Sequence, residues 1–200
     1  MKKIEISVLI GLVMTILIGS ITTFATDCSQ IREDVLRLHI LANSDTDEDQ
    51  ALKLKVRDRI LSESSELFEN PTTLEEAKSS VIDHIEKVRQ TAQDEVYANG
   101  YDYQVNAEIV NMYFTTRQYE TFTLPAGMYD AVRITIGEAK GHNWWCVLYP
   151  PLCLPAAQPE EEIEQALTEE EADLVTRNPQ YEVSFAVVEW FEDLKNALNW

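Results

Sequence analysis

Residues 35–42, VLRLHILA, decide how the rest of the chain can fold. Six of these eight residues are apolar, and the turn formers Asn43-Ser44-Asp45 follow them directly. An apolar run of this length that ends in turn residues predicts a buried β-strand. Residues 35–42 are therefore predicted to be the first strand of the hydrophobic core.

A helix is predicted directly after this strand, over about residues 47–62. Three acidic residues at 47–49 suit a first helical turn, because the helix dipole favours negative charge there. Leu52, Val56 and Ile60 then recur every four residues, which places them on one face of a helix.

A second helix, longer than the first, is predicted after the break at residues 70–73. Its apolar residues step by three and four and Asn99-Gly100 form a C-terminal cap. The apolar stripe consists of Leu74, Ala77, Val81, Ile85, Val88, Ala92 and Val96.

Residues 103–109 alternate between apolar and polar side chains, which predicts a half-buried strand of an antiparallel sheet. Further strands are expected at about 111–116, 118–123, 129–137 and 143–149, with a turn at 124–127. The predicted class is α+β, with helices packed on one face of a mostly antiparallel sheet and an N-terminal signal segment before it. Behind a linker at 155–159 we expect a helix at 160–175, a strand at 181–187 and a helix at 189–198.

The N-terminus has the pattern of a secretory signal peptide. Lys2 and Lys3 precede an apolar run at 6–18, and Thr23-Phe24-Ala25 provides a cleavage pattern of small residues. We expect residues 1–25 to be removed, and an uncleaved anchor is the alternative. Residues 26–200 are then one α+β domain, with 155–200 as an acidic C-terminal appendage.

The charge of the chain excludes one large class of function. There are 16 Lys and Arg against 35 Asp and Glu, which gives a net charge of −19. Nucleic-acid binding depends on clustered Lys and Arg at phosphates, so no nucleic-acid partner is expected. The same charge opposes contact with anionic lipid, and no stable membrane insertion is expected after cleavage. It favours a cationic patch on a protein partner.

Signs of catalysis are weak. The His and Cys residues have no metal-ligand spacing, and no phosphate-binding or nucleophile motif is present. No catalytic residue, metal or cofactor is therefore expected. Cys146 and Cys153 flank a turn at Tyr149-Pro150-Pro151 and are the candidate disulfide, with two buried free thiols as the alternative.

Two segments are more distinctive than a plain domain requires. Residues 38–58, LHILANSDTDEDQALKLKVRD, join the end of the first strand to a helix N-terminus. Residues 141–153, GHNWWCVLYPPLC, place Trp144 and Trp145 on opposite faces of a strand.

Both segments resemble the stage II sporulation protein R family. The resemblance implies export from the forespore into the space between forespore and mother cell. It also implies activation of a membrane-embedded aspartic protease of the stage II sporulation protein GA type, which cleaves the sigma E precursor. The chain is then a ligand and not an enzyme.

Under this interpretation the two segments contain the contact surface for the protease. Two other functions stay open: an exported hydrolase of cell wall or peptide that uses Cys146 with His39 or His142, and a self-assembling scaffold of the spore envelope. The partner-binding candidates are His39, Asn43, Ser44, Asp45, Asp49, Gln50, Lys53, Arg57, His142, Asn143, Trp144 and Trp145.

Overall fold

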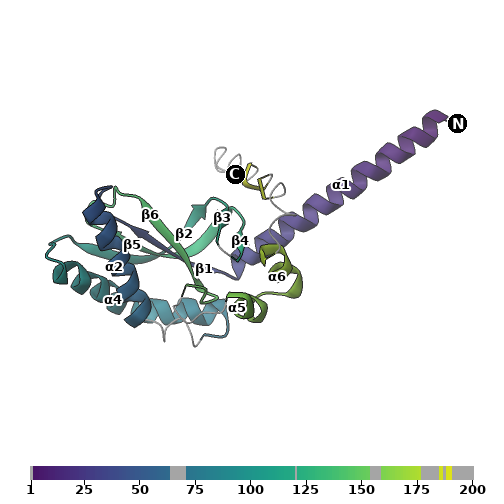
Figure 1. Ribbon diagram of the computed structural model, residues 1–200. Coiled ribbons are helices and arrows are strands. Elements are labelled where there is room, and N and C mark those ends of the chain that lie inside the picture. Colours follow the sequence, from purple (N-terminus) through teal and green to yellow (C-terminus); the bar gives the residue numbers. More distant parts are fainter. Residues whose placement is uncertain are drawn as a thin grey trace. The chain divides into compact units, whose positions relative to one another are not determined.

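The computed structural model describes residues 2–63, 71–119, 121–153, 159–176, 185–186 and 188–190 (Figure 1). The chain divides into two compact units. The sheet unit contains residues 34–114 and 128–168, and the helical unit contains residues 1–33, 115–127 and 169–200. The limits predicted for the signal segment and the single domain stay predictions.

The sheet unit is built on four strands in the order β2-β5-β1-β6. Their bounds are β1 Leu36–Leu41, β2 Val105–Phe114, β5 Gly127–Ile136 and β6 Asn143–Tyr149. Strand β1 pairs in parallel with β5 and antiparallel with β6. The α+β class is confirmed, whereas the mostly antiparallel sheet is wrong because this sheet is mixed. Side-chain alternation shows which residues share a face, but it carries no information on strand direction.

Two helices cover one face of this sheet. Helices α2 (Asp47–Glu63) and α4 (Leu74–Ala98) contact each other, and Figure 1 shows them next to each other beside the strands. Every second residue of β1 belongs to the same buried cluster as the apolar stripes of both helices, as the alternation of a strand requires. The cluster includes Leu36, Leu38, Ile40, Leu52, Val56, Ile60, Val81, Val88 and Val96.

Helix α4 begins and ends where its sequence indicates. The Thr73 side chain accepts a hydrogen bond from the backbone N–H of Glu76 at 3.2 Å. Asn99 is the C-cap residue, and Gly100 follows with φ of +82°, a conformation that glycine adopts without a steric penalty. The predicted stripe is buried or partly buried along the whole helix.

Several predicted boundaries were wrong. Strand β2 runs unbroken through residues 105–114, where two strands were expected, and the segment predicted as a strand at 118–123 is a hairpin of β3 (Arg117–Gln118) and β4 (Thr123–Leu124). The expected helix at 160–175 is divided into α5 (Pro159–Ala166) and α6 (Glu169–Thr176). The three glutamates after Thr168 favour a new helix start, because they lie in its first turn.

The C-terminal predictions fall mostly outside the described residues. Phe185 and Ala186 are helical, so the strand predicted at 181–187 is wrong at these two positions. Residues 188–190 are helical, in agreement with the start of the predicted last helix. The remainder of both segments lies beyond the part of the chain that the structure describes.

In the helical unit, α1 (Lys2–Glu33) continues without a break across the expected cleavage pattern. Its last turns are packed: Cys28 and Ile31 are fully buried, and Arg32 Nη1 donates to the carbonyl oxygen of Ala126 at 3.0 Å. The Arg32 side chain occupies the space that a Cβ on Gly127 would need, which explains a glycine there. Among the described residues, no helix combines the length and hydropathy of a membrane span.

Candidate functional site

The two distinctive sequence segments lie side by side. Strand β1 pairs antiparallel with β6, with Leu38 opposite Cys146, His39 opposite Trp145 and Leu41 opposite Asn143. The loop after β1 therefore meets the loop before β6, where Gly141 N–H donates to the Ala42 carbonyl at 3.0 Å. A side chain on Gly141 would collide with the Ser44 backbone, so the close approach requires glycine.

A buried carboxylate organises the corner between β1 and α2. Asp49 is 4% exposed and accepts hydrogen bonds from Asn43 Nδ2 at 2.8 Å and Ser44 Oγ at 2.5 Å. Burial by itself raises the pKa of Asp49, but the hydrogen bonds from Ser44, Asn43 and Tyr103 together outweigh it and the pKa is lowered. Asn43 Oδ1 also accepts from the Glu138 backbone at 3.0 Å, so one amide joins both loops.

A lysine joins the corner to the β6 loop. Lys53 Nζ donates to Gln50 Oε1 at 2.6 Å and to the His142 carbonyl at 2.9 Å. Gln50 in turn donates to the Ser44 carbonyl at 2.9 Å. Burial lowers the pKa of Lys53, and the nearby Asp45 carboxylate partly opposes this shift. These side chains hold the loops in place.

Three predicted contact residues lie at the surface of this frame, and one of them, Asn143, also has a side-chain hydrogen bond with the buried His39. Asp45 Oδ1 accepts from the backbone N–H of His142 and pairs with its Nδ1, each at 2.5 Å. The side chains of His142 and Asp45 stay 79% and 54% exposed, and Asn143 beside them is exposed as well. We call Asp45, His142 and Asn143 the exposed corner.

The two tryptophans lie on opposite faces of the sheet, as expected. Trp144 lies on the α2 side, where the Arg57 guanidinium stands 4.9 Å from the centre of its ring. Trp145 lies on the other face and stacks on the His39 ring, with the centroids 3.9 Å apart and an interplanar angle of 15°. Both tryptophans are partly buried.

His39 belongs to the core. It is 3% exposed, and Phe114 contacts both His39 and Trp145 edge-on. Its pKa is lowered to about 4, chiefly by burial; the Asn143 side chain opposes the shift, and Arg133 and Arg37 add to it. His39 is therefore not available for direct contact, unlike the exposed corner.

Sequence reasoning missed Arg37, which lies on the same face as His39. Arg37 is fully buried, and its guanidinium lies 4.0 Å from the ring centre of Phe114 and 4.9 Å from that of Tyr129. Alternation along β1 could have indicated this, because Arg37 and His39 must share one face. The distant aromatic partners could not be inferred from it.

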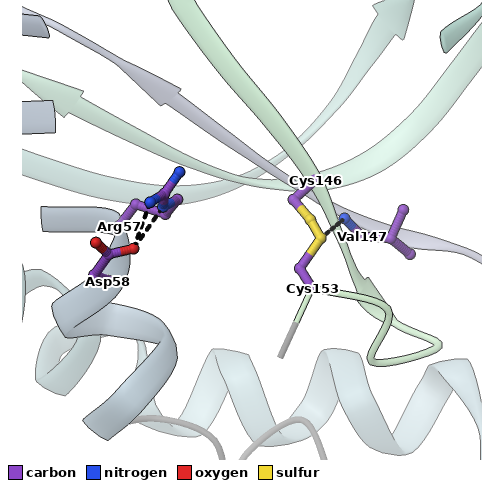
Figure 2. The surroundings of a disulfide bond; sticks show 5 residues. All are labelled: Arg57, Asp58, Cys146, Val147 and Cys153. Carbon is purple, nitrogen blue, oxygen red and sulfur yellow. Dashed lines mark hydrogen bonds and ion pairs between the residues drawn. A yellow bond between two sulfur atoms is a disulfide. The ribbon is translucent and has the colours of Figure 1, made fainter. Parts of the chain in front are cut away.

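The expected disulfide joins Cys146 to Cys153, with their Cα atoms 6.2 Å apart (Figure 2). The backbone N–H of Val147 lies 3.1 Å from Cys153 Sγ. Cys28 is not part of this bridge and is buried. The bond removes the Cys146 thiolate that a nucleophile would need.

A groove of about 700 Å³ lies between α2 and β6 and is called the α2–β6 groove below. Figure 2 shows the Arg57–Asp58 ion pair of α2 and the disulfide beside it. Within the described ranges, no group of three or more His, Cys, Asp or Glu residues could hold a metal ion. The lining of the groove includes Lys55, Arg57, Arg59, Trp144, Cys146 and Cys153.

In a comparison with known proteins, one family model matches a region that contains both distinctive segments. The family model described as stage II sporulation protein R (spore_II_R) matches residues 32–159. The stage II sporulation protein R of Bacillus subtilis (strain 168) is 32% identical over 185 residues, covering 82% of this chain and 83% of that protein. No solved structure matches the chain.

Proposed function

Because this chain belongs to the stage II sporulation protein R family, with a role in sporulation, we propose that it is an exported signal that acts by binding. It is made in the forespore and exported into the space between forespore and mother cell. There it activates a membrane-embedded aspartic protease of the stage II sporulation protein GA type. That protease then cleaves the sigma E precursor.

One observation carries the proposal: the two distinctive segments join into one corner that presents an exposed polar surface. The side chains of Asn43, Asp49 and Lys53 form hydrogen bonds that hold the loop after β1 against the loop before β6. The exposed corner is therefore fixed in position before any partner binds, which limits the entropy lost on association.

Binding activates the protease by selecting one of its states. A ligand shifts an equilibrium only as far as it prefers one state over the other. The exposed corner provides a carboxylate, an imidazole and an amide for contacts that the active state alone makes. A thiol hydrolase is the weaker proposal, because the Cys146 sulfur is bonded to Cys153.

The proposal is tested by co-expressing the full chain with the protease and the sigma E precursor in a non-sporulating bacterium. Precursor cleavage is followed on a blot. Replacing His142 by alanine removes an exposed contact and leaves the hydrogen bond between Asn143 and His39 intact, so cleavage should slow about tenfold, as for loss of an interface anchor. The matched control replaces His84 by alanine, because His84 is exposed on α4.

Three outcomes separate the claims. Slow cleavage with the corner variant and normal cleavage with the α4 variant supports the surface. Normal cleavage with a folded corner variant contradicts the surface assignment. No stimulation by the unaltered, folded chain contradicts protease activation itself.

A further inference from the structure

The α2–β6 groove concentrates positive charge in an acidic chain. Helix α2 contains four cationic residues within positions 53–59, out of 16 Lys and Arg in the whole sequence. Lys55, Arg57 and Arg59 line the groove, against the two carboxylates of Asp58 and Glu95. Glu63, outside the lining, pairs with Arg59 at 2.6 Å, so cations and carboxylates are about equal in number around the groove. The chain as a whole has a net charge of −19, so this groove is far less acidic than the rest.

The floor of the groove is apolar. It contains the Trp144 ring, which the Arg57 guanidinium faces at 4.9 Å, together with Leu61 and the Cys146–Cys153 disulfide. Leu61 is 5% exposed, so it extends the core to the groove surface. The Arg57 guanidinium above the Trp144 ring can bind a carboxylate, and the ring beside it can contact an apolar side chain.

The carboxylates around the groove do not close it to an incoming anion. Asp58 accepts from Arg57 Nε at 2.7 Å and Nη2 at 2.6 Å, but its side chain is 64% exposed. Exposed ion pairs of this kind contribute about 0–1 kcal/mol, so another carboxylate can replace Asp58 at little cost. Glu95 Oε1 is already occupied by a hydrogen bond from Asn99 Nδ2 at 2.8 Å.

We propose that the α2–β6 groove binds an acidic, apolar peptide segment of the protein's partner. A partner carboxylate takes the place of Asp58 on Arg57, where the guanidinium can bind two oxygens at once. The adjacent apolar side chain packs on Trp144 and the disulfide. The volume of about 700 Å³ lies within the range of about 300–1,000 Å³ in which proteins bind compact ligands.

Because the rest of the chain is acidic, the charge distribution favours binding of an acidic segment at this groove over other parts of the surface. An acidic segment is repelled by most of the surface and least repelled at the groove, where Lys55, Arg57 and Arg59 gather, so the charge distribution guides it to one place. The identity of the partner as the protease rests on the proposed function. The chemistry of the ligand does not, and it is tested separately.

The direct test uses the full, oxidised chain in a mild non-ionic detergent and three fluorescein-labelled peptides. The peptides alternate leucine with glutamate, glutamine or lysine, and binding is measured by fluorescence anisotropy. The glutamate peptide should bind most tightly, and Arg57→Gln should raise its Kd about tenfold. Arg89→Gln is the matched control, because both arginines are ion-paired and have similar exposure, 24% for Arg57 and 27% for Arg89.

The same two variants in the co-expression assay connect the groove to activation. Arg57→Gln should slow precursor cleavage about tenfold, and Arg89→Gln should leave it unchanged. Equal peptide binding by the two variants, or no binding of the glutamate peptide, overturns the inference. Normal cleavage with Arg57→Gln, when the unaltered chain activates, overturns the assignment of the protease as the partner that fills the groove and leaves the proposed function intact. An unaltered chain that binds the glutamate peptide through Arg57 without activating the protease contradicts only the proposed function.

Discussion

At the scale of single residues, His39 and Asp45 are close in sequence but differ in environment, because His39 is buried and Asp45 is exposed. His39 lies in β1 against Trp145 and Phe114, where a protonated imidazole would lose its hydration. Asp45 lies a few residues later in the exposed corner, where its charge stays hydrated. The register of β1 explains the difference, because it directs His39 into the sheet face and ends before Asp45.

His39 should make the protein less stable in mild acid. Its pKa is about 6.5 unfolded and about 4 folded, so the unfolded chain binds the proton more readily between these values. The free energy of unfolding is therefore fully retained above pH 6.5 and falls as the pH decreases to 4. We expect this residue to account for about 2 kcal/mol of the loss after solvent screening is considered.

Urea unfolding at several pH values, followed by tryptophan fluorescence, measures this effect. His39→Phe keeps an aromatic ring against Trp145 and should flatten the pH dependence between pH 6.5 and 4. His84→Phe, on the exposed surface of α4, should keep the original slope. An unchanged slope in His39→Phe would mean that other groups carry the pH dependence.

At the scale of elements, the helices follow local sequence more closely than the sheet does. Helix α4 is predicted within a residue or two because the break at residues 70–73, its stripe and Asn99-Gly100 all lie within or next to the segment itself. Strand β2 continues past residue 109, although the alternation there is weaker, since pairing with β5 maintains it. Strand ends thus depend on neighbours that are distant in sequence.

The Thr73 cap should contribute measurably to stability. Thr73→Ala leaves the Glu76 N–H without its acceptor, so the free energy of unfolding should fall by about 1 kcal/mol. Chemical denaturation of the full chain measures the change. Ser79→Ala, at an exposed position inside α4, is the control and should be neutral or slightly stabilising. Equal effects from both variants would refute a specific capping role.

At the scale of the whole molecule, net charge is the dominant property. A charge of −19 on 200 residues produces self-repulsion in the compact state. Salt screens this repulsion, because the Debye length falls from about 30 Å at 0.01 M to about 10 Å at 0.1 M. The α2–β6 groove, where Lys55, Arg57 and Arg59 gather, is a local exception to this excess of acidic residues.

Salt should therefore stabilise the protein. Raising NaCl from about 0.01 M to about 0.3 M at pH 7.5 should increase the free energy of unfolding by about 1 kcal/mol. Thermal unfolding followed by circular dichroism measures the shift. The same titration near pH 4.4, the isoelectric point, should have a smaller effect. A decrease in stability with salt at pH 7.5 would show that attractive ion pairs outweigh the repulsion.

The sequence by itself determined the α+β class and helices α2 and α4, and it offered Cys146–Cys153 as a candidate pairing, which the structure contains. All of these depend on periodicity, caps or unusual residues within one segment. Only the tertiary structure decided that β1 and β5 are parallel, that His39 is buried and that Asp45, His142 and Asn143 form the exposed corner. These features arise from contacts between distant segments, and local patterns specify which face a side chain occupies but not what covers that face.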